Sequence, residues 1–569
     1  MNRQQRRLEK KGKKKKGVLD AATQAEVDGI LNLGLQNHQA GMLDDAQTLY
    51  KKVLSLDPKN TEANHLLGVV AHHMGDLDGG IKLISKAVRS HPGHFVALNN
   101  LGNAQAQAGL STDAEKSYRK ALKFKPDYAM AHGNLGKVLM DTGRLDHAIK
   151  HLSRAIQLDA ANPVHHINHG EACMTSGLVE EAEASFRKGL DLTPDDYSVH
   201  NELGILLQAE GRLDEAEACY KSAIEINETS VEAHVNMGIL MEDSLRFEES
   251  KNNFQHAIEL EPGNVDAHRN LGMLLLRQGD FENGFTEYAW RPSAHARDEE
   301  SQFLGKAWDG GGETGRRILI HAEQGLGDTI QFARYLPVLE GMGYEIVFEC
   351  QPSLVDLMAS LPGDFQVIAK GDTLPDFDIH APLLSLPGLL KGTVATIPSG
   401  DTYLSAPADL IDQWKERLSG GERKKVGLVW RGRAEHNNDK NRSASLALFA
   451  QHLSDVEADF YCLQKDLTKD EQKMPDGFEN IGKDFSDFTE TAAALKNLDL
   501  VISVDTSVAH LAGALGVPTW LLLPTPPDWR WLMDRDDTPW YAAMRLFRKQ
   551  GLEDWHGVLE KVAGELNNF

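Results

Sequence analysis

The residues best suited to chemistry lie in loops of the second half of the chain. The loop at 325–328 has the sequence GLGD and stands between an apolar segment and a predicted helix. Gly325 and Gly327 allow the backbone to approach a ligand closely, and the free N–H groups of a helix start attract anions. Asp328 can cap the helix that continues through Thr329 or act as a catalytic base, and the two roles are compatible.

A second cluster of polar residues begins where the apolar segment LVISV ends, in DTSVAHLAGALGVPTW at 505–520. Asp505, Thr506 and Ser507 are placed to cap a helix and to present hydroxyl and N–H groups to an anion. His510 follows Ser507 by three residues, on the same helix face. Because no nucleophile elbow or third partner accompanies this pair, the pattern favours hydrogen bonds to a sugar or diphosphate over a Ser–His nucleophile.

A third loop, RGRAEHNNDKNRS at 431–443, is basic and rich in amides. Guanidinium and ammonium groups match phosphate oxygens, so the loop is either a diphosphate site or an exposed, solvated segment. Its candidate phosphate partners are Arg431, Arg433, Lys440 and Arg442. Gln464 and Lys465 end another strand at the same predicted edge, and Trp529 and Trp531 are either stacking platforms or core residues.

Alternating strands and helices must position these loops. Such alternation predicts parallel sheets, here in two tandem α/β units, with the ligand at the carboxyl ends of the strands. The first unit has predicted strands at 316–322, 344–350, 365–369 and 377–381 and a helix at 329–342. The second has predicted strands at 425–432, 459–464, 499–505 and 518–524 and helices at 444–454, 488–497 and 507–515, and a helix at 408–418 connects the units.

The motifs GLGDTIQFARYLP, VISVDTSVAHLAGALGVPTW and LLPTPPDWRW together resemble glycosyltransferase family 9, the heptosyltransferase-like enzymes, over residues 315–550. The resemblance implies a GT-B fold within 296–569, made of two Rossmann-like halves at about 315–400 and 424–550. By position, Asp328 matches the family's general base. Asp505, Thr506, Ser507 and His510 match its donor-sugar and diphosphate site, and Arg442, with Lys440 as the alternative, takes the place of a phosphate-binding lysine.

The implied reaction is a direct, inverting transfer of a sugar from a nucleotide-diphosphate donor to an acceptor hydroxyl. Asp328 would accept the hydroxyl proton, while the helix start at 506–507 and Arg442 would stabilise the departing diphosphate. The resemblance therefore implies no metal and no cofactor beyond the donor substrate. The DxD triplets at 376–378 and 534–536 are not predicted metal sites, because the first enters a strand and the second lies beyond the core motifs.

The first half of the chain is a repeat array. Glycines recur every 34 residues, a small residue follows each by twelve positions and a bulky residue by sixteen. A period of 34 is typical of stacked helix–turn–helix units, in which small residues let two helices approach and large ones fill the remaining gap. The repeating glycines are Gly34, Gly68, Gly102, Gly136, Gly170, Gly204, Gly238 and Gly272.

The segment NLGNAQAQAGLSTDAEKSYRKALKFKPDY at 100–128 resembles the tetratricopeptide repeat, and the likeness covers about 27–291. It implies an α-solenoid of about eight repeats at 25–295 that binds a protein or peptide. The repeats contain many histidines, which we interpret as packed or solvated because none pairs with Cys at zinc-site spacing. These are His65, His72, His73, His91, His94, His165, His166 and His169.

Composition narrows the function further. The net charge is −24, and nine basic residues against Glu9 give +8 to residues 1–17, so the remainder carries −32. An acidic body argues against a nucleic-acid enzyme, and the basic tail at 1–24 is interpreted as disordered. We find no apolar run long enough for a membrane span. Scattered cysteines without a CxxC motif favour free thiols and a cytoplasmic location.

Two functions from different classes follow. The favoured one is a glycosyltransferase whose repeat groove recruits a protein acceptor. The alternative is a protein-binding scaffold whose GT-B domain no longer turns over. The presence of Asp328 and of the whole 505–510 set favours the enzyme.

Overall fold

The structure is a computed structural model that describes residues 20–297, 300, 303–398, 402–433, 438–550 and 554–569. It contains two compact units, 1–228 and 229–569. Residues 1–19 of the predicted disordered tail at 1–24 lie outside the described residues, whereas residues 21–24 are helical. Among the described residues, no helix combines the length and the apolar character needed to cross a membrane.

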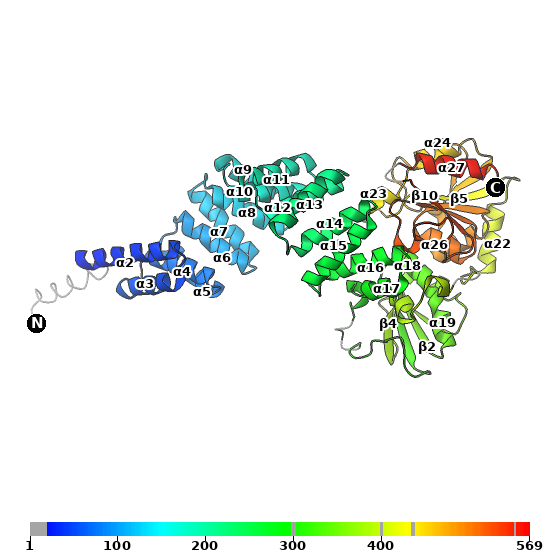
Figure 1. Cartoon of the computed structure of the whole chain (residues 1–569), viewed down its shortest axis with the longest axis horizontal. Coiled ribbons are helices and arrows are strands. Elements are labelled where there is room, and N and C mark those ends of the chain that lie inside the picture. Colours follow the sequence, from blue (N-terminus) through cyan, green and yellow to red (C-terminus); the bar gives the residue numbers. More distant parts are fainter. Residues whose placement is uncertain (1–19, 298–299, 301–302, 399–401, 434–437, 551–553) are drawn as a thin grey trace, which may run out of the picture. The chain divides into compact units, whose positions relative to one another are not determined.

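The first unit consists of antiparallel helix pairs (Figure 1). The helices are α2 (Ala21–Gln39), α3 (Leu43–Leu56), α4 (Thr61–His73), α5 (Leu77–Ser90), α6 (Phe95–Gln107), α7 (Ser111–Phe124), α8 (Ala129–Asp141), α9 (Leu145–Leu158), α10 (Pro163–Thr175), α11 (Val179–Leu192), α12 (Tyr197–Ala209) and α13 (Leu213–Ile226). The first begins four residues before the predicted solenoid start at 25, because the Asp20 carboxylate accepts the Thr23 N–H at 2.9 Å and caps it.

The repeating glycines have the packing role that their spacing predicts. A Cβ added to Gly102 would lie 2.4 Å from the ring of Tyr118, sixteen residues later, and one added to Gly170 would lie 2.7 Å from Phe186. The bulky residue of the second helix therefore occupies the space of the missing side chain, and both aromatic residues are buried. The 34-residue period of the sequence therefore reflects a helix-packing contact that recurs in each repeat.

The turns between paired helices need a left-handed residue. Gly41 (φ 76°) and Gly75 (φ 86°) show this conformation, which glycine adopts without steric cost. Leu245 occupies the same turn position with φ 61°, so this one turn of the second unit holds a side chain in a strained conformation.

The second unit begins with further repeat helices and continues into the α/β part. The repeat helices are α14 (Val231–Asp243), α15 (Phe247–Leu260), α16 (Val265–Arg277) and α17 (Phe281–Tyr288). The later helices are α18 (Leu326–Phe332), α19 (Leu336–Gly341), α20 (Val355–Met358), α21 (Leu386–Leu389), α22 (Ala408–Arg417), α23 (Asp439–Arg442), α24 (Leu446–Leu453), α25 (Phe488–Leu495), α26 (Ser507–Ala514) and α27 (His556–Leu566). The predicted helix at 329–342 is instead α18 and α19 joined by a 3₁₀ turn, η2 (Ala333–Tyr335).

Two parallel sheets form the α/β part. The strands of the first are β1 (Arg317–His321), β2 (Glu345–Cys350), β3 (Gln366–Ala369) and β4 (Ile379–Pro382), in the order β3-β2-β1-β4. Those of the second are β5 (Lys424–Val429), β6 (Ala458–Cys462), β7 (Phe478–Asn480), β8 (Leu500–Val504), β9 (Thr519–Leu523) and β10 (Met544–Arg548), in the order β10-β9-β8-β5-β6-β7. When the strands of each sheet are numbered separately in chain order, both sheets contain the strand order 3-2-1-4 that is typical of doubly wound folds.

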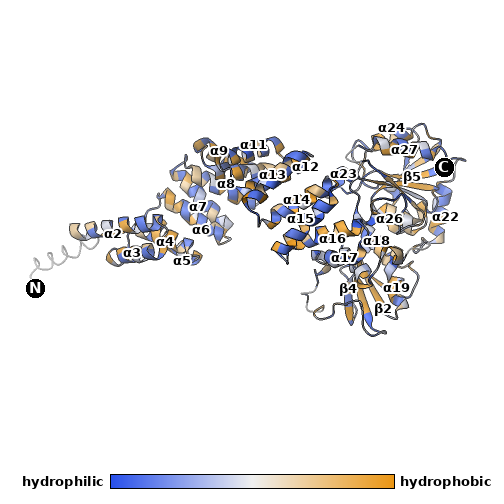
Figure 2. Cartoon of the chain, in the orientation of Figure 1, coloured by the Kyte–Doolittle hydropathy of each residue, from blue (hydrophilic) through white to orange (hydrophobic). Residues whose placement is uncertain are grey.

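Hydropathy explains why these segments form central strands. Strands β8 and β9 are buried along their whole length, whereas Figure 2 shows that the repeat helices carry both hydrophilic and hydrophobic residues. A strand covered on both faces needs an apolar run, and a helix with one exposed face does not. The predicted strands are present within a few residues. Strands β7 and β10 and helices α20, α21, α23 and α27 were not predicted.

The last repeat belongs to the core of the second unit. Phe281, Phe285 and Tyr288 share one hydrophobic cluster with Trp529 and Trp540. The rings of Phe285 and Trp529 meet edge to face at 5.7 Å. Residues on both sides of the predicted boundary at 295 therefore share a core, and the second compact unit comprises residues 229–569.

This packing predicts unequal effects of two glycine-to-alanine substitutions. In Gly272→Ala the new Cβ would lie 2.5 Å from the backbone nitrogen of Tyr288, which cannot rotate away. We expect a loss of about 1–3 kcal/mol in the free energy of unfolding, measured by urea denaturation. Gly29→Ala is the matched control because no heavy atom lies within 4 Å of its Cβ position. It should stabilise helix α2 by up to about 1 kcal/mol, and equal effects of the two changes would contradict the packing role.

Candidate functional site

The two loops with the strongest chemical patterns meet in the second unit. A Cβ added to Gly327 would lie 2.9 Å from Cδ2 of His510 and 3.4 Å from Cα of Ser507. The start of α18 thus contacts the start of α26, and only glycine permits this approach. The loop at 325–328 and the helix start at 505–510, predicted separately from sequence, therefore form one site.

Asp328 is held by two contacts. Its Oδ2 accepts the N–H of Gly325 at 2.8 Å, and its Oδ1 pairs with the guanidinium of Arg530. The first contact is a capping contact, but Asp328 is the third residue of α18 and not the predicted N-cap residue before Thr329. Thr329 donates its hydroxyl hydrogen to Gln351 Oε1 at 2.9 Å. Burial raises the pKa of Asp328, and Arg530 opposes the rise. The side chain is 20% exposed, so a ligand can reach it.

Arg530 is the centre of the polar network. It lies in a 3₁₀ turn, η7 (Trp529–Trp531), and besides pairing with Asp328 it donates to Gln331 Oε1 at 2.9 Å and to Asp528 Oδ1 at 2.9 Å. Arg530 was not predicted as a site residue, because only the tryptophans of PPDWRW were considered as candidates. An arginine flanked by buried aromatic residues was the signal that could have identified it.

Asp505 lies on the other side of the same turn. Its Oδ2 accepts the indole N–H of Trp531 at 2.9 Å, and its Oδ1 lies 3.7 Å from Nε2 of His510. Burial, followed by the negative charge of Asp528, raises the pKa of Asp505 to about 6. Burial lowers the pKa of His510 to about 3, so its imidazole is neutral at pH 7.

The tryptophans of PPDWRW are core residues and not exposed platforms. Trp529 and Trp531 are both buried, and Trp531 stacks on His510 at a centroid distance of 5.3 Å. His510 also shares a hydrogen bond of 2.9 Å with the hydroxyl of Tyr541, another residue that sequence analysis missed. His510 therefore supports the site from within the core.

The start of α26 is built differently from its prediction. Thr506 is the N-cap residue, but its hydroxyl contacts Ser503 Oγ at 3.1 Å, and within the described residues no side chain of the N-cap bonds to the helix start. Ser507 is the first helical residue. The first N–H groups of α26 thus keep the positive end of the helix dipole without a capping carboxylate.

The basic loop is divided between two environments. Arg442 donates to the backbone oxygen of Asp505 at 3.3 Å and so lies at the site. Arg431 instead pairs with Glu471 at 3.0 Å, and its role as a phosphate partner stays a prediction. Lys440 and Arg433 are exposed, and residues 434–437 lie outside the described part.

Gln464 and Lys465 follow β6, as predicted. The Gln464 side chain is partly buried, whereas Lys465 is exposed and donates to the backbone oxygen of Ser486 at 3.4 Å. No contact between these two residues and Asp505 or Asp328 is present among the described interactions. Their donor-binding role stays a prediction.

Comparison with known proteins confirms the repeats. Family models for the tetratricopeptide repeat match residues 38–101, 99–163, 168–231 and 253–284. Repeats of this kind indicate a protein-binding scaffold. The matched residues end at 284, and the resemblance of residues 315–550 to glycosyltransferase family 9 stays a prediction.

Among curated proteins, the chain is 25% identical over 324 residues to Protein FlbA of Caulobacter vibrioides, covering 52% of this chain and 54% of that protein. The chain thus matches about half the length of this relative. Solved structures with some likeness include MamA, at 26% identity over 28% of this chain and 95% of that one, with a TM-score of 0.27. YrrB, described as a TPR protein with an unusual peptide-binding site, has 20% identity over 32% and 95%, with a TM-score of 0.29. A tetratricopeptide repeat protein of Parabacteroides merdae has 16% identity over 44% and 98%, with a TM-score of 0.36.

Removing the central cation should destabilise the second unit. Arg530→Met leaves the carboxylates of Asp328 and Asp528 without their shared partner, and we expect a loss of about 3–5 kcal/mol in the free energy of unfolding. Tryptophan fluorescence during urea denaturation measures it, because Trp529 and Trp531 flank the substitution. Arg535→Met, which breaks an outer ion pair with Asp537, is the control and should change stability by less than about 0.5 kcal/mol. Equal losses would show that Arg530 does not hold the network.

The free energy of unfolding of the second unit should decrease as pH rises, because Asp505 loses its proton. Its folded pKa of about 6 exceeds the unfolded value of about 3.9, so the folded state holds the proton more tightly. The resulting stabilisation is complete below about pH 4 and is lost as pH rises through about 6. The thermal midpoint should fall more over this window in the wild type than in Asp505→Asn. Parallel curves for the two proteins would contradict the raised pKa.

Proposed function

We propose that the α/β part is a GT-B glycosyltransferase that moves a sugar from a nucleotide-diphosphate donor to an acceptor hydroxyl. The observation that supports it is the contact of α18 with α26 at Gly327, which brings Asp328 and the 505–510 set into one site. The motifs that resemble glycosyltransferase family 9 are the ones that meet there. The two parallel sheets, each with the 3-2-1-4 order, are compatible with the two Rossmann-like halves of that fold.

In the proposed reaction, Asp328 accepts the proton of the acceptor hydroxyl while the oxygen attacks the anomeric carbon with inversion. A positioned base contributes about 10²–10⁴-fold to such a step. The bond to the nucleotide diphosphate breaks at the same time. The N–H groups at the start of α26 and the guanidinium of Arg442 would stabilise the departing negative charge, so the reaction needs no metal.

The repeats supply the second part of the proposal. Tetratricopeptide repeats indicate a peptide or protein partner, and we propose that this partner is the acceptor of the sugar. The buried, unpaired cysteines, such as Cys350 and Cys462, fit a reducing compartment, so we place the reaction in the cytoplasm.

The second candidate is a scaffold that binds a nucleotide or a partner without turnover. One observation favours it. Both oxygens of Asp328 already have partners, Gly325 and Arg530, as a purely structural carboxylate would. This candidate differs from the first only in the chemical step.

The decisive experiment separates donor binding from turnover. The purified chain is screened by thermal shift against nucleotide sugars and free nucleoside diphosphates, since a ligand at a hundredfold excess over Kd stabilises the folded state by about 2.7 kcal/mol. We expect one nucleotide class to bind, Asp505→Ala to abolish the shift, and Asp328→Asn to keep it while lowering transfer or donor hydrolysis by about 10²–10⁴-fold.

Asp537→Asn, at an exposed position, is the control and should leave both readouts unchanged. Donor binding without turnover in the wild type would favour the scaffold that senses a nucleotide. Absence of binding across the panel would overturn the enzyme proposal.

A further inference from the structure

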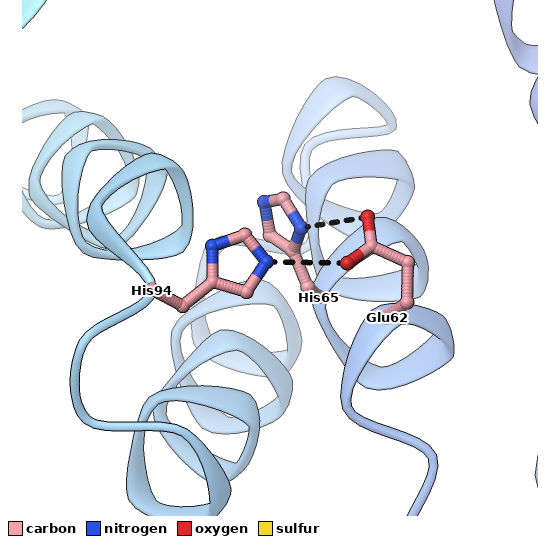
Figure 3. A group of neighbouring side chains, drawn as sticks. All are labelled: Glu62, His65 and His94. Atoms are coloured by element: carbon pink, nitrogen blue, oxygen red, sulfur yellow. Dashed lines mark hydrogen bonds and ion pairs between the residues drawn. The ribbon is translucent and has the colours of Figure 1, made fainter.

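Three polar side chains meet between two consecutive repeats of the first unit. Glu62 and His65 lie one turn apart on α4, and His94 is the N-cap residue of α6 in the next repeat. Figure 3 shows both imidazole rings directed at the Glu62 carboxylate. Sequence spacing gave no hint of this group, because His65 and His94 are brought together only by repeat stacking.

The distances are those of a metal-ligand set. Oε2 of Glu62 lies 3.1 Å from Nε2 of His94, and Oε1 lies 3.5 Å from Nδ1 of His65. One donor atom from each residue can be chosen so that all three lie within 4.8 Å of one another. Two ligands of a tetrahedral zinc ion, bound at about 2.1 Å, are separated by about 3.4 Å, so modest side-chain adjustment closes the set around an ion.

A buried atom with unmet hydrogen-bonding capacity points into this group. His65 is only 3% exposed, and its Nδ1 has no hydrogen-bond partner among the described residues although it faces Glu62. Buried polar atoms are almost always satisfied, so such an atom calls for a ligand. A metal ion bound at Nδ1 would satisfy it once the ring proton has moved to Nε2.

The charge also fits a cation. A glutamate carboxylate such as that of Glu62 is ionised at neutral pH and supplies one negative charge. Two neutral imidazoles and one carboxylate match divalent first-row ions such as Zn²⁺ and Co²⁺ better than Mg²⁺ or Ca²⁺, which prefer oxygen ligands.

We propose that Glu62, His65 and His94 bind a divalent transition-metal ion of the zinc class, with water completing its coordination. Because the ligands come from α4 and from the cap of α6, the ion would tie two consecutive repeats together. This proposal concerns the first unit and stands independently of the sugar-transfer proposal.

Metal binding requires a shift of two protons. His65 Nε2 lies 3.0 Å from the Asn100 amide nitrogen, and His94 Nδ1 accepts the N–H of Ala97 at 3.2 Å, so in the metal-free form the ring protons face Glu62. On binding, each ring must carry its proton on its other nitrogen. Asn100 must then turn its oxygen toward His65, and α6 loses its His94 cap, which opposes binding.

The test uses Zn²⁺ alone on the full chain, free of affinity tag and stripped with a chelator. Competition with a chromophoric chelator gives stoichiometry and affinity, and Co²⁺ absorption reports the geometry. The variants are Glu62→Gln and His94→Asn, the second because asparagine already caps helices of this chain at Asn60 and Asn162. Each should lose one zinc equivalent or weaken its affinity by about 100-fold or more, since a direct ligand matters at least as much as an outer contact.

Two control variants address adventitious binding. His256→Asn removes an exposed histidine paired with Glu259, and His132→Asn breaks the His132–His151 contact. Both should bind zinc as the wild type does, and zinc should raise the melting temperature of the wild type but not of His94→Asn. The proposal is overturned if Glu62→Gln and His94→Asn, folded by circular dichroism, bind zinc like the wild type, or if the wild type binds no more tightly than they do. If one variant does not fold, the other decides.

Discussion

The arrangement of the candidate site depends on one buried cation, the guanidinium of Arg530. A charge removed from water must be paired, and here the pairing draws on two carboxylates and one amide. Asp328 comes from the first half of the α/β part, while Asp528 and Arg530 come from the second. The ion pair therefore joins the two halves where the loop at 325–328 contacts the start of α26.

The residues on both sides of Arg530 in this turn contact other parts of the second unit. Trp529 on one side packs against Phe285 of the last repeat, and Trp531 on the other donates to Asp505. The same loop is held by Arg277 of α16, which donates to the backbone oxygen of Pro527 at 2.8 Å. Within the second unit, the last repeat is thus a structural support of the site and not a separate module joined by a linker.

Sequence reasoning succeeded where the pattern is local or periodic. The 34-residue glycine period that ends at Gly272 reflects repeated helix packing, so the repeat helices could be predicted. Apolar runs such as LVISV reflect burial on both faces of a sheet, so the central strands could be predicted. Pairings between distant residues could not. The pairing of Arg431 with Glu471 could not be predicted because Glu471 follows forty residues later. Arg530 was passed over because its partner Asp328 lies 202 residues earlier. The group of Glu62, His65 and His94 could not be predicted for the same reason, because His94 approaches the other two residues only when the repeats stack.

The pairing of Asp328 bears on whether it can act as a base. A carboxylate has about four lone-pair positions, and Gly325 and Arg530 use one on each oxygen. Two positions remain, and the side chain is partly exposed. The group of Arg530, Asp328 and Asp528 carries a net charge of −1 when both carboxylates are ionised, and burial disfavours such a charge. Accepting a proton at Asp328 would make the group neutral while Asp528 still pairs with Arg530. The second carboxylate therefore lets the first change its protonation state without leaving the buried cation unpaired, a property that a base requires and a purely structural ion pair does not.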